Sequence, residues 1–185
     1  MTSGAFPLIT MLAQATQPAV EAMNIWQFIG QMGGALALGM AALGSSLGIG
    51  MAGRAAAGAW AKEAKAGQRL RFVYIILLGM PISQTLYAMI VMNKIKAALM
   101  EPGTMAIRAA MTAQYAGVLL AVGIAVGIGE LFSAWMQGLI GAAGIRAISE
   151  GEGKGFAFMI IAMGIVETVG IFTMVFTLGL IPAAG

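Results

Sequence analysis

The sequence predicts an all-α membrane protein with four transmembrane helices, arranged as two hairpins that are related by duplication. Of its 185 residues, 60% are apolar and only 9% are charged. An ordinary soluble domain has about 25% charged residues, so this chain cannot cover a water-facing surface. Four segments reach the length of about 20 apolar residues that a spanning helix needs, and the two halves share a motif.

The composition excludes several other classes of protein. The chain has no cysteine and no histidine, which excludes disulfides, thiol catalysis and the usual zinc ligands. Its net charge of +3 gives no reason to expect nucleic acid as a partner. The 27 glycines are typical of membrane helices that pack closely, because small residues let two backbones approach each other.

The expected helices run from about Ile25 to Ala57, Phe72 to Met92, Met111 to Ile145, and Phe156 to Ile181. The first and third are rich in glycine and alanine, so we expect them to form a crowded inner wall. The second and fourth are richer in large apolar residues and are expected to face lipid or a partner. The chain divides into an N-terminal segment at 1–24, a first hairpin at 25–95, a connecting loop at 96–110 and a second hairpin at 111–185.

Basic residues set the expected orientation of this multi-pass chain in the cell membrane. The connections at 58–71 and 146–155, counted with the adjoining helix ends, hold seven of the ten basic residues: Arg54, Lys62, Lys65, Arg69, Arg71, Arg146 and Lys154. The middle connection, counted as residues 93–110, holds the other three: Lys94, Lys96 and Arg108. By the positive-inside rule, the two connections at 58–71 and 146–155 are cytoplasmic and both termini lie on the other side.

Residues 1–24 form a weakly apolar segment that contains Pro7 and Pro18. The segment has no basic residue, whereas a signal peptide normally begins with positive charge. We expect a short external segment that lies partly in the membrane. A short leader that is cleaved near Ala13 to Ala15 is the alternative.

The second and fourth helices carry a repeated motif. The second reads GMPISQTLYAMIVM from Gly79, and the fourth reads AMGIVETVGIFTMV from Ala162. A shift of 83 residues superposes them and places Gln84 on Glu167. Each half is a complete hairpin, so both enter the membrane in the same direction, unlike the inverted repeats of many secondary transporters.

Glu167 lies near the centre of the fourth helix and is the first candidate for a functional residue. An ionisable side chain in mid-membrane costs several kcal/mol and by default indicates a functional site. The alternative is a protonated glutamate that serves only as a hydrogen-bonding group between helices.

Neutral oxygen groups occur at matching depth on other helices. Gln84 stands at the equivalent place in the second helix, with Ser83 beside it and Tyr87 on nearly the same face. Pro81 lacks an amide hydrogen, which can free carbonyl oxygens, and Gln137 adds an amide from the third helix. Hard cations prefer oxygen ligands, and one carboxylate among neutral oxygens best balances one positive charge.

Three motifs on three helices carry a resemblance to a known family. They are MPISQTLY at 80–87, LFSAWMQG at 131–138 and VET at 166–168. With them the chain resembles, over residues 27–182, the proteolipid c subunit (K subunit) of the rotor ring in rotary V-type ATPases, in the form found in sodium-transporting members. The resemblance implies that copies of the four-helix chain assemble into a ring.

The resemblance also implies roles for individual residues. Glu167 would be the ion-binding carboxylate, and Tyr87 would hydrogen-bond to it and close the site. The implied ligands are the side chains of Glu167, Gln84, Gln137 and Ser83 and the backbone carbonyl of Met80. Ser83 stands where the family pattern has threonine. Because the full polar set is present, the resemblance implies Na+ as the cargo, with H+ as the alternative.

Glu130 departs from the pattern, which has a small residue there. It lies seven residues before Gln137, on about the same face and about 10 Å along the helix. It could hydrogen-bond while protonated, line the ring interior, or extend the ion site. We favour a structural role over a second titrating charge.

The resemblance implies a subunit that is not itself an enzyme. Its expected partners are identical copies in the ring, a stator membrane subunit with a basic residue, central-stalk subunits at the cytoplasmic loops, and lipid. The rivals are a stand-alone small transporter of a cation or drug that works as a dimer, and a purely structural membrane oligomer.

Overall fold

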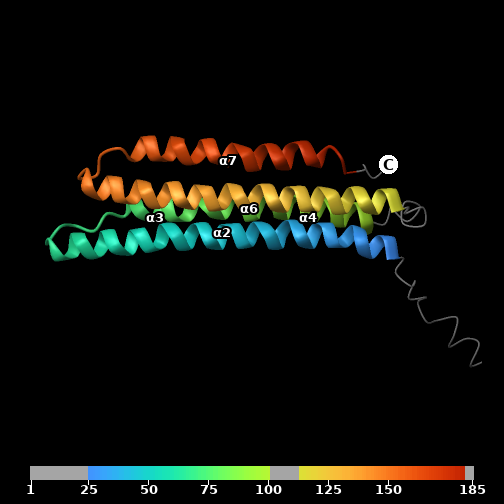
Figure 1. Cartoon of the computed structure of the whole chain (residues 1–185), viewed down its shortest axis with the longest axis horizontal. Helices are drawn as coiled ribbons and strands as arrows, with labels where there is room; N and C mark the ends of the chain where they lie inside the picture. The colour runs from blue at the N-terminus through green and yellow to red at the C-terminus, as the bar shows by residue number, and fades with distance from the viewer. Residues whose placement is uncertain (1–24, 101–112, 182–185) are drawn as a thin grey trace, which may run out of the picture.

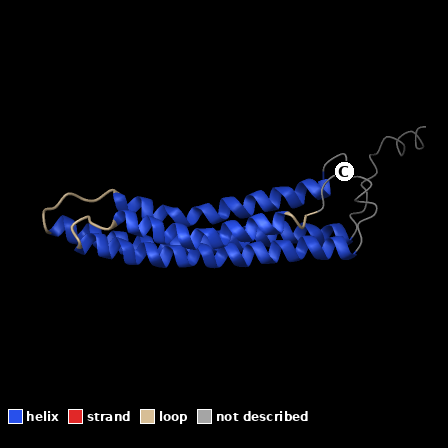
Figure 2. Cartoon of the chain, turned by 90° about the horizontal axis from the view of Figure 1, so that it is seen from above, coloured by secondary structure: helices blue, strands red, loops and turns tan. Residues whose placement is uncertain are grey.

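A computed structural model describes residues 25–100 and 113–181 of the chain. In chain order the elements are α2 (Ile25–Lys65), α3 (Val73–Gly79), the 3-10 turn η1 (Met80–Ile82), α4 (Ser83–Met100), α6 (Ala113–Glu150) and α7 (Phe156–Leu178). α3, η1 and α4 follow one another end to end, and this rod lies side by side with α2, α6 and α7 along one long axis (Figure 1), with loops confined to the ends of the bundle (Figure 2).

Within the described residues, four helices are long and apolar enough to cross a membrane. They are Ile25–Lys65, Val73–Leu99, which joins α3, η1 and α4, Ala113–Glu150 and Phe156–Leu178. The α2–α3 and α6–α7 connections lie at one end of the bundle, and the described chain begins and ends at the other (Figure 1). We call these the connection end and the termini end. The prediction of four transmembrane helices in two hairpins is confirmed.

The boundaries predicted for the helices were wrong at their polar ends. α2 continues to Lys65, α6 to Glu150 and α4 to Met100, so the first part of each expected connection, at 58–65, 146–150 and 96–100, is helical. Polar residues mark where a helix leaves the apolar layer, whereas alanine, lysine and glutamate favour its continuation in water. The predictions for 1–24 and for Arg108 fall outside the described residues.

Paired glycines bring α2 and α6 into backbone contact. A Cβ atom on Gly123 would collide with the backbone of Gly33, and one on Gly138 would collide with the backbone of Gly48. The sequence separation between the two glycines is the same in both pairs, so the two helices run parallel in constant register. The first helices of the two hairpins therefore form the tightly packed seam of the molecule, as small residues allow in membranes.

Two apolar clusters hold the bundle together and leave a polar layer between them. Toward the termini end the buried residues are Ala37, Ala41, Ala88, Val91, Ile95, Leu99, Leu119, Val122 and Val126. Toward the connection end they are Ala52, Ala56, Ala59, Tyr74, Leu77, Ile145, Ile148 and Met163. The buried polar side chains of Ser45, Gln84, Glu130, Ser133 and Gln137 lie between these clusters along the helices.

Candidate functional site

A break in the second transmembrane segment shapes one wall of the polar layer. Because Pro81 has no N–H to donate, the chain makes the 3-10 turn Met80–Ile82 between α3 and α4. The Ser45 hydroxyl of α2 donates to the Pro81 carbonyl at 2.5 Å, and the Thr85 hydroxyl donates to the Ser45 oxygen at 2.8 Å. The turn is therefore fastened to α2, which fixes the direction of the side chains that follow it.

Amide and hydroxyl groups link α4, α6 and α7 in the polar layer. The Gln84 amide donates to the Ser133 hydroxyl at 3.2 Å, which in turn donates to the Val166 carbonyl at 3.0 Å. One turn along α6, the Gln137 amide nitrogen donates to the Met163 carbonyl at 3.4 Å. Ser133 opposite Val166 and Gln137 opposite Met163 set the antiparallel register of α6 and α7. The residues around Glu167 are thus held by three helices.

Glu167 lies eleven residues from each end of α7 (Phe156–Leu178), at the middle of a membrane span. It is half-buried on the bundle surface. The Tyr87 hydroxyl of α4 donates to Glu167 Oε1 at 2.8 Å. A donor at this distance stabilises the charged carboxylate and ties the fourth transmembrane helix to the second. The carboxylate therefore has one fixed partner and a side open to lipid or to a neighbouring copy of the chain.

The Ser83 hydroxyl lies between two oxygens that the resemblance names as ligands. Ser83 Oγ is 3.0 Å from the Met80 carbonyl oxygen and 3.1 Å from Gln84 Oε1, and it has one proton to donate to either. The Met80 carbonyl also accepts the Ser83 N–H. That carbonyl is most available to a cation when the hydroxyl turns toward Gln84.

Gln137 offers an oxygen that nothing in the described residues satisfies. The side chain is fully buried, its nitrogen has a partner, and Gln137 Oε1 has none. A buried acceptor without a partner costs about 1–3 kcal/mol, so native structures rarely leave one unpaired. A cation held between Gln137 Oε1 and the nearby carboxylate would satisfy both groups.

Glu130 is buried between α6 and α7, close to Ser133, because both side chains lie against Gly170. It is 0% exposed, neither of its carboxyl oxygens has a partner among the described residues, and a Cβ atom on Gly170 would collide with Glu130 Oε2. Gly170 lies one helical turn beyond Glu167 toward the termini end. Because an unpaired buried charge is very costly, the neutral acid is the favoured form. The carboxyl is enclosed within the bundle and does not line an outer surface.

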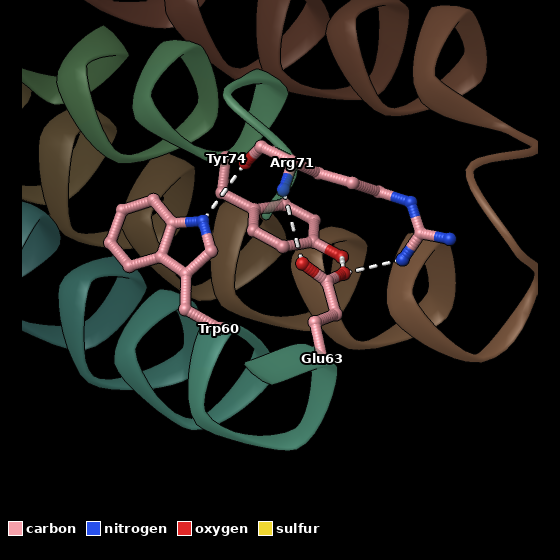
Figure 3. Close-up of polar contacts among 4 residues, drawn as sticks. All are labelled: Trp60, Glu63, Arg71 and Tyr74. Atoms are coloured by element: carbon pink, nitrogen blue, oxygen red, sulfur yellow. Dashed lines mark hydrogen bonds and ion pairs between the residues drawn. The ribbon is translucent and has the colours of Figure 1, made fainter. Parts of the chain in front are cut away.

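A second polar cluster, which the sequence did not reveal, fixes the α2–α3 connection (Figure 3). Glu63 is 1% exposed and accepts hydrogen bonds from the Arg71 N–H at 3.1 Å, the Arg71 guanidinium and the Tyr74 hydroxyl at 2.6 Å. The Trp60 ring N–H donates to the Arg71 carbonyl at 2.9 Å. Tyr74 and Glu63 together raise the pKa of the Arg71 guanidinium, so this pair stays charged and closes the turn.

Ser133 is the other residue that was missed as part of the site. It lies four residues before Gln137 inside the LFSAWMQG stretch, so helical spacing places both on one face. That spacing was a usable signal. Glu63 gave no such signal, because its partners lie across a turn whose course the sequence pattern does not fix.

Comparison with known families matches both hairpins. The family model that describes the C subunit of ATP synthase matches twice, at residues 32–93 and 120–180. The first match contains Gln84 and Tyr87, and the second contains Gln137 and Glu167. No curated protein matches the chain.

Proposed function

Because the chain belongs to the family of ATP synthase C subunits, whose members form non-catalytic, ion-translocating rings in the membrane, we propose that it is the rotor subunit of a V-type ATPase and carries Na+ on Glu167. Two family domains in one chain, a carboxylate in only one of the two repeated motifs and four membrane helices support this proposal.

The assignment to the V-type rests on the duplication and on what differs between the two halves. Gln84 takes the place in the first hairpin that Glu167 takes in the second, and it is fully buried and tied to Ser133. The chain thus has one such carboxylate for four helices. A ring of such chains carries fewer ions per turn than one with a carboxylate in each hairpin, which favours pumping against a steep gradient over ATP synthesis.

The single observation that favours Na+ over H+ is the unpartnered Gln137 Oε1. A proton on Glu167 needs only the carboxylate and leaves this buried oxygen unsatisfied. A sodium ion takes several oxygen ligands and would use Gln137 Oε1, Gln84 Oε1, Ser83 Oγ and the Met80 carbonyl beside the carboxylate. The donor set therefore suits a monovalent metal ion, with H+ as the alternative.

In this mechanism the ion makes the carboxylate tolerable in lipid. Bound Na+ neutralises Glu167, while Tyr87 holds Oε1 in place. Where the ring meets the stator, a basic residue of the stator competes for the carboxylate and releases the ion. We place the connection end in the cytoplasm, on the central stalk, because most of the basic residues lie there.

The proposal is tested by replacing Glu167 and Glu130, the two carboxylates in the membrane layer of α6 and α7, one at a time within the assembled ATPase. Glu167→Gln should abolish Na+ transport and Na+-stimulated ATP hydrolysis and leave the ring intact. The neutral amide has no negative charge with which to balance the charge of Na+. Glu130→Gln is the matched control on the neighbouring helix. It mimics the neutral acid and should retain transport. Near-normal Na+ transport by Glu167→Gln would overturn the assignment. Loss of Na+ transport in Glu130→Gln but not in Glu167→Gln would also overturn it.

A further inference from the structure

The side-chain amide of Gln84 has two ends of opposite chemistry, and only one of them suits a cation. Its oxygen is an acceptor, whereas its nitrogen carries two N–H donors. Gln84 is fully buried, with Oε1 at 3.1 Å from Ser83 Oγ and the nitrogen at 3.2 Å from Ser133 Oγ. Half a turn of the amide would exchange the two ends and bring N–H groups to the ion site. The orientation of this amide therefore matters to cation binding.

The Ser133 hydroxyl has the hydrogen-bonding capacity to select that orientation. A hydroxyl has one proton to donate and two lone pairs that accept. Ser133 uses its proton on the Val166 carbonyl oxygen at 3.0 Å, so it faces Gln84 only as an acceptor. An acceptor attracts the amide nitrogen and disfavours the amide oxygen. Ser133 is also buried, so bulk water does not compete for this contact.

Glu130 lies close enough to keep the Ser133 proton on Val166. The two side chains are three residues apart on one face of α6, and both lie against Gly170 of α7. Glu130 is fully buried, and neither of its carboxyl oxygens has a partner among the described residues. The neutral acid has one O–H to donate. Ser133 accepts one hydrogen bond, from Gln84, and its oxygen has a second lone pair for another donor.

We propose that Glu130 and Ser133 are positioning residues that orient Gln84 toward the cation. The neutral Glu130 donates its proton to Ser133 Oγ, through a rotation of the carboxyl group or one bridging water. With both lone pairs occupied by donors, Ser133 keeps its own proton on Val166 and holds the Gln84 nitrogen, so that Gln84 Oε1 faces the ion. Neither positioning residue touches the ion. The role rests on the proposed function, because it takes Na+ as the cargo of the same site.

The test measures the Na+ concentration that gives half-maximal ATP hydrolysis by the assembled complex, together with the maximal rate. Ser133→Ala and Glu130→Leu should each raise the half-saturating Na+ concentration about threefold to tenfold and leave the maximal rate reachable at high Na+. Glu130→Gln keeps an N–H donor in the same place and should stay close to the wild-type value. An equal rise in Glu130→Gln would overturn the donor role of Glu130. Thr177→Val is the control, because it removes a hydroxyl from α7 near the termini end, and it should match wild type.

A Gln84→Leu background shows whether the effect passes through the amide. With no amide to orient, adding Ser133→Ala or Glu130→Leu should raise the half-saturating Na+ concentration no further. A further rise in that background would overturn the proposal, because the two residues would then act by packing alone.

The wild-type response separates this positioning role from the cargo assignment. If wild-type hydrolysis depends on Na+ and neither Ser133→Ala nor Glu130→Leu changes the half-saturating concentration, the positioning role is overturned and the cargo assignment stands. Wild-type hydrolysis that does not depend on Na+ would overturn the cargo assignment and the positioning role together.

Discussion

Replacing Tyr87 by phenylalanine removes one atom from the site and isolates what that atom contributes. The Tyr87 hydroxyl donates to Glu167 Oε1 at 2.8 Å, and the ring itself stays in place in the variant. A hydrogen bond to a charged group contributes about 1.5–3 kcal/mol. If that energy holds the carboxylate in the ion-binding position, Na+ affinity falls by about 10-fold to 150-fold.

The assay is the Na+ concentration that gives half-maximal ATP hydrolysis by the assembled complex at fixed pH. Tyr115→Phe is the control, because Tyr115 is exposed near the start of α6 and far along the bundle from Glu167. Tyr87→Phe should raise the half-saturating Na+ concentration and leave the maximal rate reachable at high Na+. An unchanged value, or an equal rise in Tyr115→Phe, would show that this hydrogen bond does not position the carboxylate.

Two further predictions follow from the polar contacts. Gln137→Leu and Ser83→Ala each remove an oxygen from a dry site at a cost of about 1–3 kcal/mol, so each should weaken Na+ activation about tenfold to hundredfold without preventing ring assembly. Unchanged Na+ dependence in both would mean that these groups only pack and that the cargo is H+. Glu63→Ala leaves the Arg71 guanidinium and the Tyr74 hydroxyl without their shared acceptor and should destabilise the protein, because three hydrogen bonds that close the α2–α3 connection are lost. The measurement is the unfolding temperature in detergent, which should be lowest for Glu63→Ala and should lie between that value and the wild-type value for Glu63→Gln. An unaltered unfolding temperature in Glu63→Ala would contradict the structural role.

The helices and their pairing could be predicted because they depend on properties that the sequence carries locally. A run of apolar residues gives a membrane span, and the shift between Gln84 and Glu167 gives the duplication. Close packing of helices through glycine was expected from the sequence, but only the structure shows which glycines meet, such as Gly48 and Gly138. Helix ends were missed at Lys65 and Glu150 because polarity marks the edge of the apolar layer and does not end a helix.

The sequence pattern named the residues of the candidate site, whose role stays a prediction, but it did not give their geometry. Helical spacing placed Tyr87 and Gln84 near the right depth, and the structure adds the hydrogen bond from Tyr87 to Glu167. The role of Ser133 depends on the register between α6 and α7, which no local pattern sets. Glu130 was noticed from its position, but only its contact with Gly170 shows that it is enclosed between two helices.

The most direct measurement for the central proposal is the rate at which a carboxyl-directed carbodiimide labels Glu167 as Na+ is varied at fixed pH. The reagent reacts with a protonated acid in lipid, and Glu167 is half-buried on the bundle surface. Mass spectrometry of the Phe156–Leu178 segment locates the label, and Glu167→Gln should lose it. If Glu167 carries Na+, millimolar Na+ should slow the labelling, as expected for a weak site of oxygen ligands. Labelling that changes with pH and ignores Na+ would contradict the proposal and identify the cargo as H+.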